Sequence, residues 1–285
     1  PIELGDNEYG GWSPQDGASG PENWCWSPAA GSASTVMHRR YRSGATTART
    51  SGVGLASPPM KVDTGVMAPT FEEVGVRARE LEAFGYDGLM TAETAHDPFL
   101  PLAIAATHTE RIELGTGIAV AFARTPMVTA YTANDLQRAS KGRFILGLGS
   151  QIKPHIEKRF SMPWSHPAAR MREYILAMRA IWSAWNDGQP LDFRGEFYRH
   201  SLMTPFFSPA PHTYGAPKVF LAAVGEKMTE VAGEVADGIL IHGFTTERYV
   251  KEVTLPAVER GLAKAGRSRS AFEVSGPLFV VTGTT

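Results

Sequence analysis

The fold is decided by residues 112–150, which begin with IELGTGIAVAFARTP and end with SKGRFILGLGS. Both ends contain short apolar runs, as expected for strands buried on both faces of a parallel sheet. Between them a helix should start at Thr125 and Pro126, because the threonine hydroxyl can cap it and proline has no amide to leave unpaired. Gly142 ends that helix. Two buried strands joined by a helix predict a βαβ unit with parallel pairing and a right-handed crossover.

The alternation of strand and helix continues on both sides of this unit. A capping box formed by Thr70 and Glu73 marks the start of the first helix. A long helix around residues 165–188 carries an apolar and aromatic stripe that is best explained as core. Seven strands are expected in all, at residues 61–67, 88–92, from 112 onward, 144–148, 219–223, 238–242 and 272–281.

This strict alternation predicts the α/β class and a (β/α)₈ TIM-type barrel, for which ~250 residues are typical. Residues 60–285 have no room for the last strand and helix, so the barrel is expected to lack its final βα unit. The first and seventh strands would then have unpaired edges. A doubly wound open sheet is the alternative, although no Gly-x-Gly-x-x-Gly follows the first strand.

Residues 1–59 differ from the rest of the chain. They are rich in Gly, Ser, Ala, Pro and Thr, show no periodicity, and carry four arginines in their later part: Arg39, Arg40, Arg42 and Arg49. A basic arm for nucleic acid or membrane is one interpretation. A disordered or spurious extension is favoured, because no folded element accompanies the charge. The expected organisation is an N-terminal extension over 1–59 and one C-terminally truncated barrel domain over 60–285.

Composition narrows the class of protein. The 285 residues are 43% hydrophobic and 20% charged with a formal net charge of -1, which gives no electrostatic reason to expect binding to nucleic acid or an anionic membrane. The single cysteine, Cys25, excludes an internal disulfide and suits a reducing compartment. No apolar run approaches the ~20 residues of a membrane helix. We therefore expect a cytoplasmic protein that binds neither nucleic acid nor membrane.

In a TIM-type barrel the chemistry belongs at the carboxyl ends of the strands. After the second strand come Glu93 and His96, which can exchange protons. Asp97 follows, and helix capping explains it best, whereas His96 could equally be a solvated loop residue. The third and fourth strands end in glycine-containing segments where a ligand can approach, at Gly117, Ile118, Ala119, Gly149, Ser150 and Gln151.

The fifth strand leads into a helix that begins with Gly225, Glu226, Lys227 and Met228. Free amides and the dipole at a helix N-terminus favour an anion such as phosphate, and a plain strand-to-helix turn is the alternative. The sequence has no His-Glu-x-x-His, paired cysteines, P-loop or Gly-x-Ser-x-Gly, so a metal site, a nucleotide P-loop and a serine hydrolase are disfavoured. Glycine-ended strands and a phosphate turn suit a bulky, planar, phosphorylated cofactor.

Five motifs carry a family resemblance: LGTGI at 114–118, RTP at 124–126, SKGRFILGLG at 140–149, RE at 172–173 and AGEVADG at 232–238. Together they resemble the bacterial luciferase-like monooxygenase family, and within it most closely the branch of oxidoreductases that depend on the deazaflavin coenzyme F420. The resemblance runs from about residue 60 to the end. It implies a TIM-type barrel, frequent homodimers, and a flavin or deazaflavin lying across the top of the sheet.

The resemblance also implies roles for individual residues. The family's non-prolyl cis peptide would fall at Gly117–Ile118, further cofactor contacts at Gly149 and Ser150, and the cofactor-phosphate turn at residues 225–228. Some deazaflavin-dependent sugar-phosphate dehydrogenases carry an Asp-His pair after the second strand, where this chain has Glu93 and Thr94. The proton carrier implied here is therefore Glu93 or His96.

The function expected from the sequence is hydride transfer between coenzyme F420 and a small organic substrate. One alternative is an FMN-dependent monooxygenase that uses molecular oxygen. Another is a non-catalytic or degenerate cofactor-binding protein, because a fold does not by itself imply an activity. The resemblance further implies a homo-oligomer. The sequence does not identify the substrate.

Overall fold

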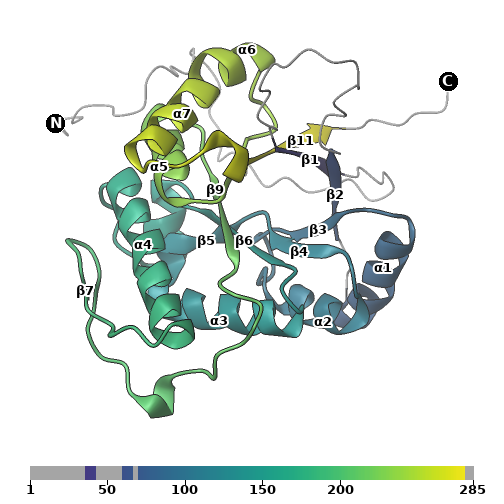
Figure 1. The fold of residues 1–285 in the computed structure, drawn as a ribbon. Coiled ribbons are helices and arrows are strands. Elements are labelled where there is room, and N and C mark those ends of the chain that lie inside the picture. The colour runs from purple at the N-terminus through teal and green to yellow at the C-terminus, as the bar shows by residue number, and fades with distance from the viewer. Residues whose placement is uncertain (1–35, 43–59, 67–69, 280–285) are drawn as a thin grey trace, which may run out of the picture. The chain divides into compact units, whose positions relative to one another are not determined.

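One sheet of mostly parallel strands organises the part of the chain that the structure describes, residues 36–42, 60–66 and 70–279 of a computed structural model (Figure 1). A short strand, β5 (Ala119–Val120), continues β4 after a break and pairs with β6. Seven strands run parallel to one another: β2 (Lys61–Gly65), β3 (Gly88–Thr91), β4 (Glu113–Thr116), β6 (Phe144–Gly149), β9 (Lys218–Ala222), β10 (Gly238–Leu240) and β11 (Glu273–Phe279).

The connecting helices lie beside the sheet (Figure 1). The α-helices are α1 (Phe71–Ala83), α2 (Leu100–His108), α3 (Pro126–Ala139), α4 (Pro167–Asn186), α5 (Glu226–Val235), α6 (Glu247–Tyr249) and α7 (Leu255–Lys264). Short 3₁₀ and π-helical turns occupy Ala121–Ala123, His155–Arg159, Pro205–Phe207, Val250–Thr254 and Arg269–Ala271. A two-stranded hairpin of β7 (Phe193–Arg194) and β8 (Arg199–His200) interrupts the alternation between α4 and β9.

The order of strands and helices is that of a TIM-type barrel. Hydrogen-bonded neighbours run β4, β3, β2, β1 (Val36–Arg42), β11, β10, β9, β6, and β4 also pairs with β6, so the pairings form a ring. The helices keep the same order, with α1 against α2, α2 against α3, α3 against α4, α4 against α5 and α5 against α7. The predicted α/β class and TIM-type fold are confirmed.

The predicted local signals produce the predicted helices. The Thr125 hydroxyl accepts from the amide of Val128, and Pro126 is the first residue of α3. Thr70 caps α1 in the same way, through the amide of Glu73. The aromatic stripe of α4 is core, as predicted: Trp182 is buried and its indole nitrogen donates to the carbonyl oxygen of Ala130 in α3 at 3.1 Å.

The place between β2 and β11 differs from the prediction. Strand β1 (Val36–Arg42) lies there, antiparallel to both neighbours. The first and seventh strands of the barrel are therefore paired, and the expectation of unpaired edges is wrong. The expectation of no folded element within residues 1–59 is wrong for 36–42, and it lies outside the described residues for the remainder. β1 was missed because its pattern has no apolar periodicity.

The ion pairs of Arg40 explain how β1, which has no apolar periodicity, fits between β2 and β11. Its guanidinium is 1% exposed and binds the Asp63 carboxylate through two hydrogen bonds of 2.6 and 2.7 Å. Glu113 lies 2.6 Å from the same guanidinium, and Lys61 pairs with Glu113 in turn. Burial acts to lower the pKa of Arg40, but these carboxylates raise it above its ordinary value. Arg40 of β1 is thus a buried charge that the carboxylates of Asp63 and Glu113 compensate.

Two further observations concern membrane-spanning helices and metal sites. Of the helices that the structure describes, none combines the length and apolar character needed to cross a bilayer. Within residues 36–42, 60–66 and 70–279, no cluster of three or more His, Cys, Asp and Glu side chains is arranged to hold a metal ion.

Candidate functional site

The residues predicted to carry chemistry follow the carboxyl ends of adjacent strands. Residues 92–97 follow β3, 117–118 join β4 to β5, and 150–151 follow β6. Residues 223–225 join β9 to α5, and 226–228 are the first residues of that helix. Because these strands are parallel neighbours in the sheet, the segments share one edge of it (Figure 1). This is the edge at which α/β barrels place their active sites.

A bulge interrupts the pairing of the third barrel strand at this edge. Ladder pairing stops at Gly115 opposite Ile145 and resumes at Ala119 opposite Leu148. Three residues on one strand thus face two on the other, which is the geometry of a β-bulge. The peptide between Gly117 and Ile118 is cis, which confirms the prediction made for it. On the β6 side, residues 116–118 therefore leave the ladder, whereas Thr116 stays paired with Thr91 of β3. Gly117 and Ile118 are half-buried at the carboxyl edge of the sheet.

Thr116 replaces the ladder bonds that the bulge removes. Its hydroxyl accepts from the amide of Gly147 at 2.9 Å and donates to the carbonyl oxygen of Gly147 at 2.7 Å. Thr116 is completely buried, so these groups of β6 have no access to water. Gly147 must be glycine here, because a Cβ would lie 1.8 Å from the Thr116 carbonyl oxygen. The sequence analysis did not identify this interaction.

The predicted contacts at the end of β6 lie against the bulge. A Cβ on Gly149 would come within 2.7 Å of the Ile118 side chain, so the two residues pack closely. Ser150 donates to the carbonyl oxygen of Gln151, and Gln151 adopts a left-handed conformation with φ of 62°. Ile118, Gly149 and the two residues after it therefore form one continuous surface. Ala119 is buried behind it.

Glu93 is the predicted acid–base residue that lies beside the bulge. Its Oε2 accepts from the amide of Val120 at 2.7 Å and from Arg124 Nη1 at 2.6 Å. Asp97 also binds Arg124, through Oδ2 at 3.0 Å, and its Oδ1 accepts from the amide of Phe99. Asp97 was predicted to be the N-cap of α2, but the N-cap is Phe99 and no side chain caps the helix; Asp97 Oδ1 instead accepts from the amides of Phe99 and Leu100. The contacts that Arg124 makes with Glu93 and Asp97 were not predicted.

His96, the other predicted acid–base residue, lies in the same loop and is exposed. A second arginine holds this loop, since Arg159 donates from Nη2 to the carbonyl oxygen of Thr94 at 2.7 Å. Arg159 belongs to the π-helical turn at His155–Arg159, which follows β6. The loops after β3 and β6 are therefore tied together above the bulge. No sequence signal pointed to Arg159.

The predicted phosphate turn stands at the start of α5. Gly225 is the N-cap residue, and no side chain caps the helix. A Cβ on Gly225 would meet nothing within 4 Å, so the space in front of these amides is open. Glu226 is exposed and pairs with Arg260 of α7 at 2.6 Å.

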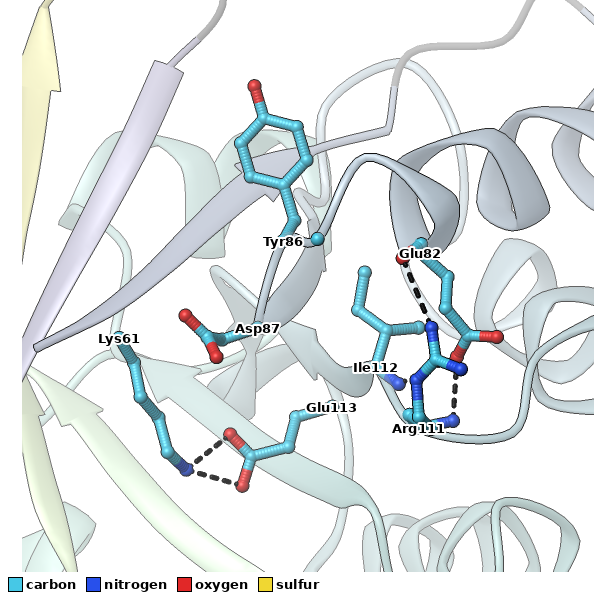
Figure 2. A pocket seen from close by; sticks show the side chains of 8 residues that line it. Lys61, Glu82, Tyr86, Asp87, Arg111, Ile112 and Glu113 are labelled. Carbon is cyan, nitrogen blue, oxygen red and sulfur yellow. Dashed lines mark hydrogen bonds and ion pairs between the residues drawn. The ribbon is translucent and has the colours of Figure 1, made fainter. Parts of the chain in front are cut away.

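A cavity of about 420 Å³ lies at the opposite edge of the sheet, beside the amino ends of β2 and β4 (Figure 2). Figure 2 shows Lys61 paired with Glu113 on one side of it and Glu82 beside Arg111 on the other. The Glu82 carboxylate accepts from the amides of residues 110–112. Partial burial acts to raise the pKa of Glu82, but these hydrogen bonds lower it. Lys61, Glu113 and Glu82 thus make ion pairs and hydrogen bonds that stabilise the fold.

Comparison with protein families agrees with the geometry of the carboxyl edge. Residues 48–285 match the family model described as luciferase-like monooxygenase. The chain belongs to the luciferase-like monooxygenase family. The family resemblance read from the sequence motifs is confirmed. The matched region begins after β1, so β1 lies outside the part of the chain that the family shares.

Two relatives in this family illustrate its range. An uncharacterised protein of Mycobacterium tuberculosis strain H37Rv is 64% identical over 203 residues, which cover 71% of this chain and 60% of that protein. A putative coenzyme F420-dependent oxidoreductase of the same strain is 32% identical over 211 residues, covering 70% of this chain and 59% of that protein. The chain thus spans about 60% of the length of these relatives.

Solved structures of low identity share the fold. The coenzyme F420 dependent tetrahydromethanopterin reductase of Methanopyrus kandleri superposes with a TM-score of 0.61 and 22% identity, covering 74% of this chain and 63% of that one. The oxygenating constituent of 3,6-diketocamphane monooxygenase from Pseudomonas putida, in complex with FMN, gives 0.57 and 20%, covering 71% and 60%. Proteins with this fold thus include one that depends on coenzyme F420 and one that binds FMN.

Proposed function

We propose that this protein is an oxidoreductase that transfers a hydride between coenzyme F420 and a small organic substrate. The observation that carries the proposal is the bulge at 116–118, which stands at the carboxyl edge of the sheet beside the glycine-ended strand β6. The bulge and β6 together present a surface of backbone and small side chains that suits a flat ring. A relative named as a putative F420-dependent oxidoreductase supports the choice of cofactor.

The turn at 225–228 fits the phosphate of such a cofactor. Gly225 leaves the approach open, α5 has no side-chain cap, and its first-turn amides are the donors that bind anions at helix N-termini. The turn follows β9, the neighbour of β6 in the sheet, so one elongated ligand can span from the turn to the bulge. Lys227 and Met228 would lie beside the phosphate in this arrangement.

When bound, the deazaflavin supplies the carbon centre that gives or takes the hydride. The protein must then hold the ring, orient the substrate and move a proton at the reacting carbon of the substrate. His96 is exposed at the same edge and can exchange protons with a substrate there. Glu93 is the other candidate from the sequence. Ser150 and Gln151 extend the polar rim beside Gly149.

An FMN-dependent monooxygenase is the second candidate. It is supported by a structural neighbour of the same fold that is in complex with FMN. A flat ring on the bulge and a phosphate at the turn describe FMN as well as the deazaflavin, so the geometry does not separate the two. The chemistry does, because the reduced deazaflavin transfers hydride and reacts poorly with oxygen, whereas reduced FMN activates oxygen.

Turnover with and without oxygen tests the proposal. The chain is incubated with reduced coenzyme F420, or separately with reduced FMN, and panels of small aldehydes and ketones. Oxidised F420 with small alcohols tests hydride transfer in the reverse direction. We expect cofactor oxidation coupled to carbonyl reduction under argon, at a rate that air does not increase. Oxygen-dependent product formation with FMN, and none with F420, would support the monooxygenase. Turnover with neither cofactor would support a non-catalytic protein.

The homo-oligomer implied by the family resemblance stays a prediction. Light scattering coupled to size-exclusion chromatography measures it directly, and we expect a mass that is a multiple of the 30.9 kDa chain. A mass equal to one chain would contradict the prediction.

A further inference from the structure

Glu93 is joined to the bulge through both its backbone and its side chain. Its amide donates to the carbonyl oxygen of Ile118 at 3.0 Å, and its Oε2 accepts from the amide of Val120 at 2.7 Å. The two bonds therefore hold the residues on either side of Ala119, where the ladder with β6 resumes. The Glu93 side chain is only 7% exposed, so both bonds are protected from competing water.

Arg124 fixes the same carboxylate from the other side. Its Nη1 lies 2.6 Å from Glu93 Oε2 and 3.2 Å from the carbonyl oxygen of Val120. Its Nη2 binds Asp97, and its guanidinium lies 5.3 Å from the centre of the Phe99 ring. Burial acts to lower the pKa of Arg124, but the hydrogen bonds and charges of the two carboxylates raise it. Arg124 therefore stays charged and links the loop after β3 to the end of β5.

These contacts leave one oxygen of Glu93 occupied by two donors. Val120 and Arg124 both bind Oε2, and neutralising this carboxylate would weaken its ion pair with Arg124. A group arranged in this way holds its neighbours more readily than it exchanges protons with a ligand. The bulge needs such support, because residues 116–118 have lost their ladder with β6 and keep backbone pairing only on the β3 side.

We propose that Glu93 and Arg124 are positioning residues that hold residues 117–120 in the shape that receives the cofactor ring. The proposal rests on the proposed function and refines it, because it removes Glu93 from proton transfer and leaves that role to His96. Glu93 acts through the backbone of Ile118 and Val120, and Arg124 acts through Glu93.

The test compares Glu93→Gln, Arg124→Met and the double variant with the wild-type chain. Arg77→Met is the matched control, because Arg77 forms an exposed ion pair with Glu80 on the surface of α1. Amide hydrogen exchange at Val120 is measured by NMR in the cofactor-free chain. Affinity for coenzyme F420 is measured by fluorescence titration, and the pH profile of turnover is recorded for each variant. Arg124→Lys tests rescue, since it restores the charge without the guanidinium fork.

We expect both single variants to accelerate exchange at Val120, and the control to leave it unchanged. Each should weaken F420 binding about tenfold or more, as expected when a charge-assisted hydrogen bond is lost. The double variant should bind no more weakly than the weaker-binding single variant, because the two residues act as one unit. The pH profile of turnover should keep its shape, and Arg124→Lys should recover part of the affinity.

Two results would overturn the proposal. Unchanged exchange at Val120 in both variants would show that the bonds do not hold the bulge. Full F420 affinity in Glu93→Gln, with turnover lost and one limb of the pH profile gone, would make Glu93 the proton carrier. Failure of the wild-type chain to bind F420 would instead contradict the proposed function, and exchange in the cofactor-free chain would then decide the positioning role by itself.

Discussion

The hydroxyl of Thr116 bonds both backbone groups of Gly147, at 2.9 Å to its nitrogen and 2.7 Å to its oxygen. One side chain thus replaces two ladder hydrogen bonds at the point where the bulge interrupts the pairing of β4 with β6. This replacement is possible because a hydroxyl group can donate one hydrogen bond and accept another at the same time. It lets the strand leave the sheet without leaving buried polar groups of Gly147 unpaired.

Replacing Thr116 by valine should destabilise the protein by about 2–4 kcal/mol, because a buried amide and a buried carbonyl lose their partners. Urea unfolding measures the change. Thr116→Ser is the control, since it keeps the hydroxyl and should cost about 1 kcal/mol or less. Equal stability of the valine and serine variants would show that water or another group satisfies Gly147.

Substitution by alanine should reduce the stability of the protein strongly at Gly147 and hardly at all at Gly225. A Cβ on Gly147 would overlap the backbone oxygen of Thr116, so Gly147→Ala should cost about 3 kcal/mol or more. A Cβ on Gly225 would meet nothing within 4 Å and its φ of -74° suits any residue, so Gly225→Ala should change stability by less than about 0.5 kcal/mol. Unfolding curves of the two variants decide it, and similar losses would contradict the described packing.

The pairing of Arg40 with Asp63 should make the stability of the barrel depend on β1. Arg40→Met leaves the buried Asp63 without its partner and should cost about 3–5 kcal/mol. Adding Asp63→Leu removes the unpaired charge, so the double variant should regain much of that loss. Denaturant unfolding of the three variants measures the coupling. An unchanged midpoint for Arg40→Met would show that β1 does not occupy its place between β2 and β11.

Stability below neutral pH should depend on Glu82. Its pKa is lowered in the folded protein by three backbone amides, against the opposing effect of partial burial. A lowered pKa adds stability above the ordinary glutamate value of about 4.3, and this is lost as pH falls through the folded pKa. Unfolding free energy measured between pH 6 and about pH 3 should fall less steeply in Glu82→Gln than in wild type. Parallel curves would contradict this role.

Much of the fold could be predicted because its signals are local. Thr125 and Pro126 start α3, and the apolar runs around Leu114 and Leu146 give buried parallel strands. β1 could not be predicted in this way. Its inward side chain is Arg40, whose burial depends on Asp63, a residue of another strand. A charge that is paired only through tertiary structure carries no apolar pattern that the sequence could reveal.

The position of the candidate site could be predicted, but the contacts among its side chains could not. Strand ends place Glu93, Ile118 and Gly149 at one edge, because parallel strands finish together. Which partners they take depends on side-chain contacts between segments far apart in sequence. Arg124 was read as part of a motif, and its contact with Glu93 appears only once β3 and β5 are brought together. For this reason Glu93 looked like a proton carrier in the sequence and like a support in the structure.

The proposed function requires that coenzyme F420 bind at the carboxyl edge of this sheet. Equilibrium titration of the purified chain with F420 and, separately, with FMN tests it most directly, with deazaflavin and flavin fluorescence as the two readouts. We predict saturable binding of one F420 per chain, weakened by a Gly225→Glu variant that adds a negative charge at the phosphate turn, and not displaced by FMN. Tight binding of FMN together with no binding of F420 would contradict the account.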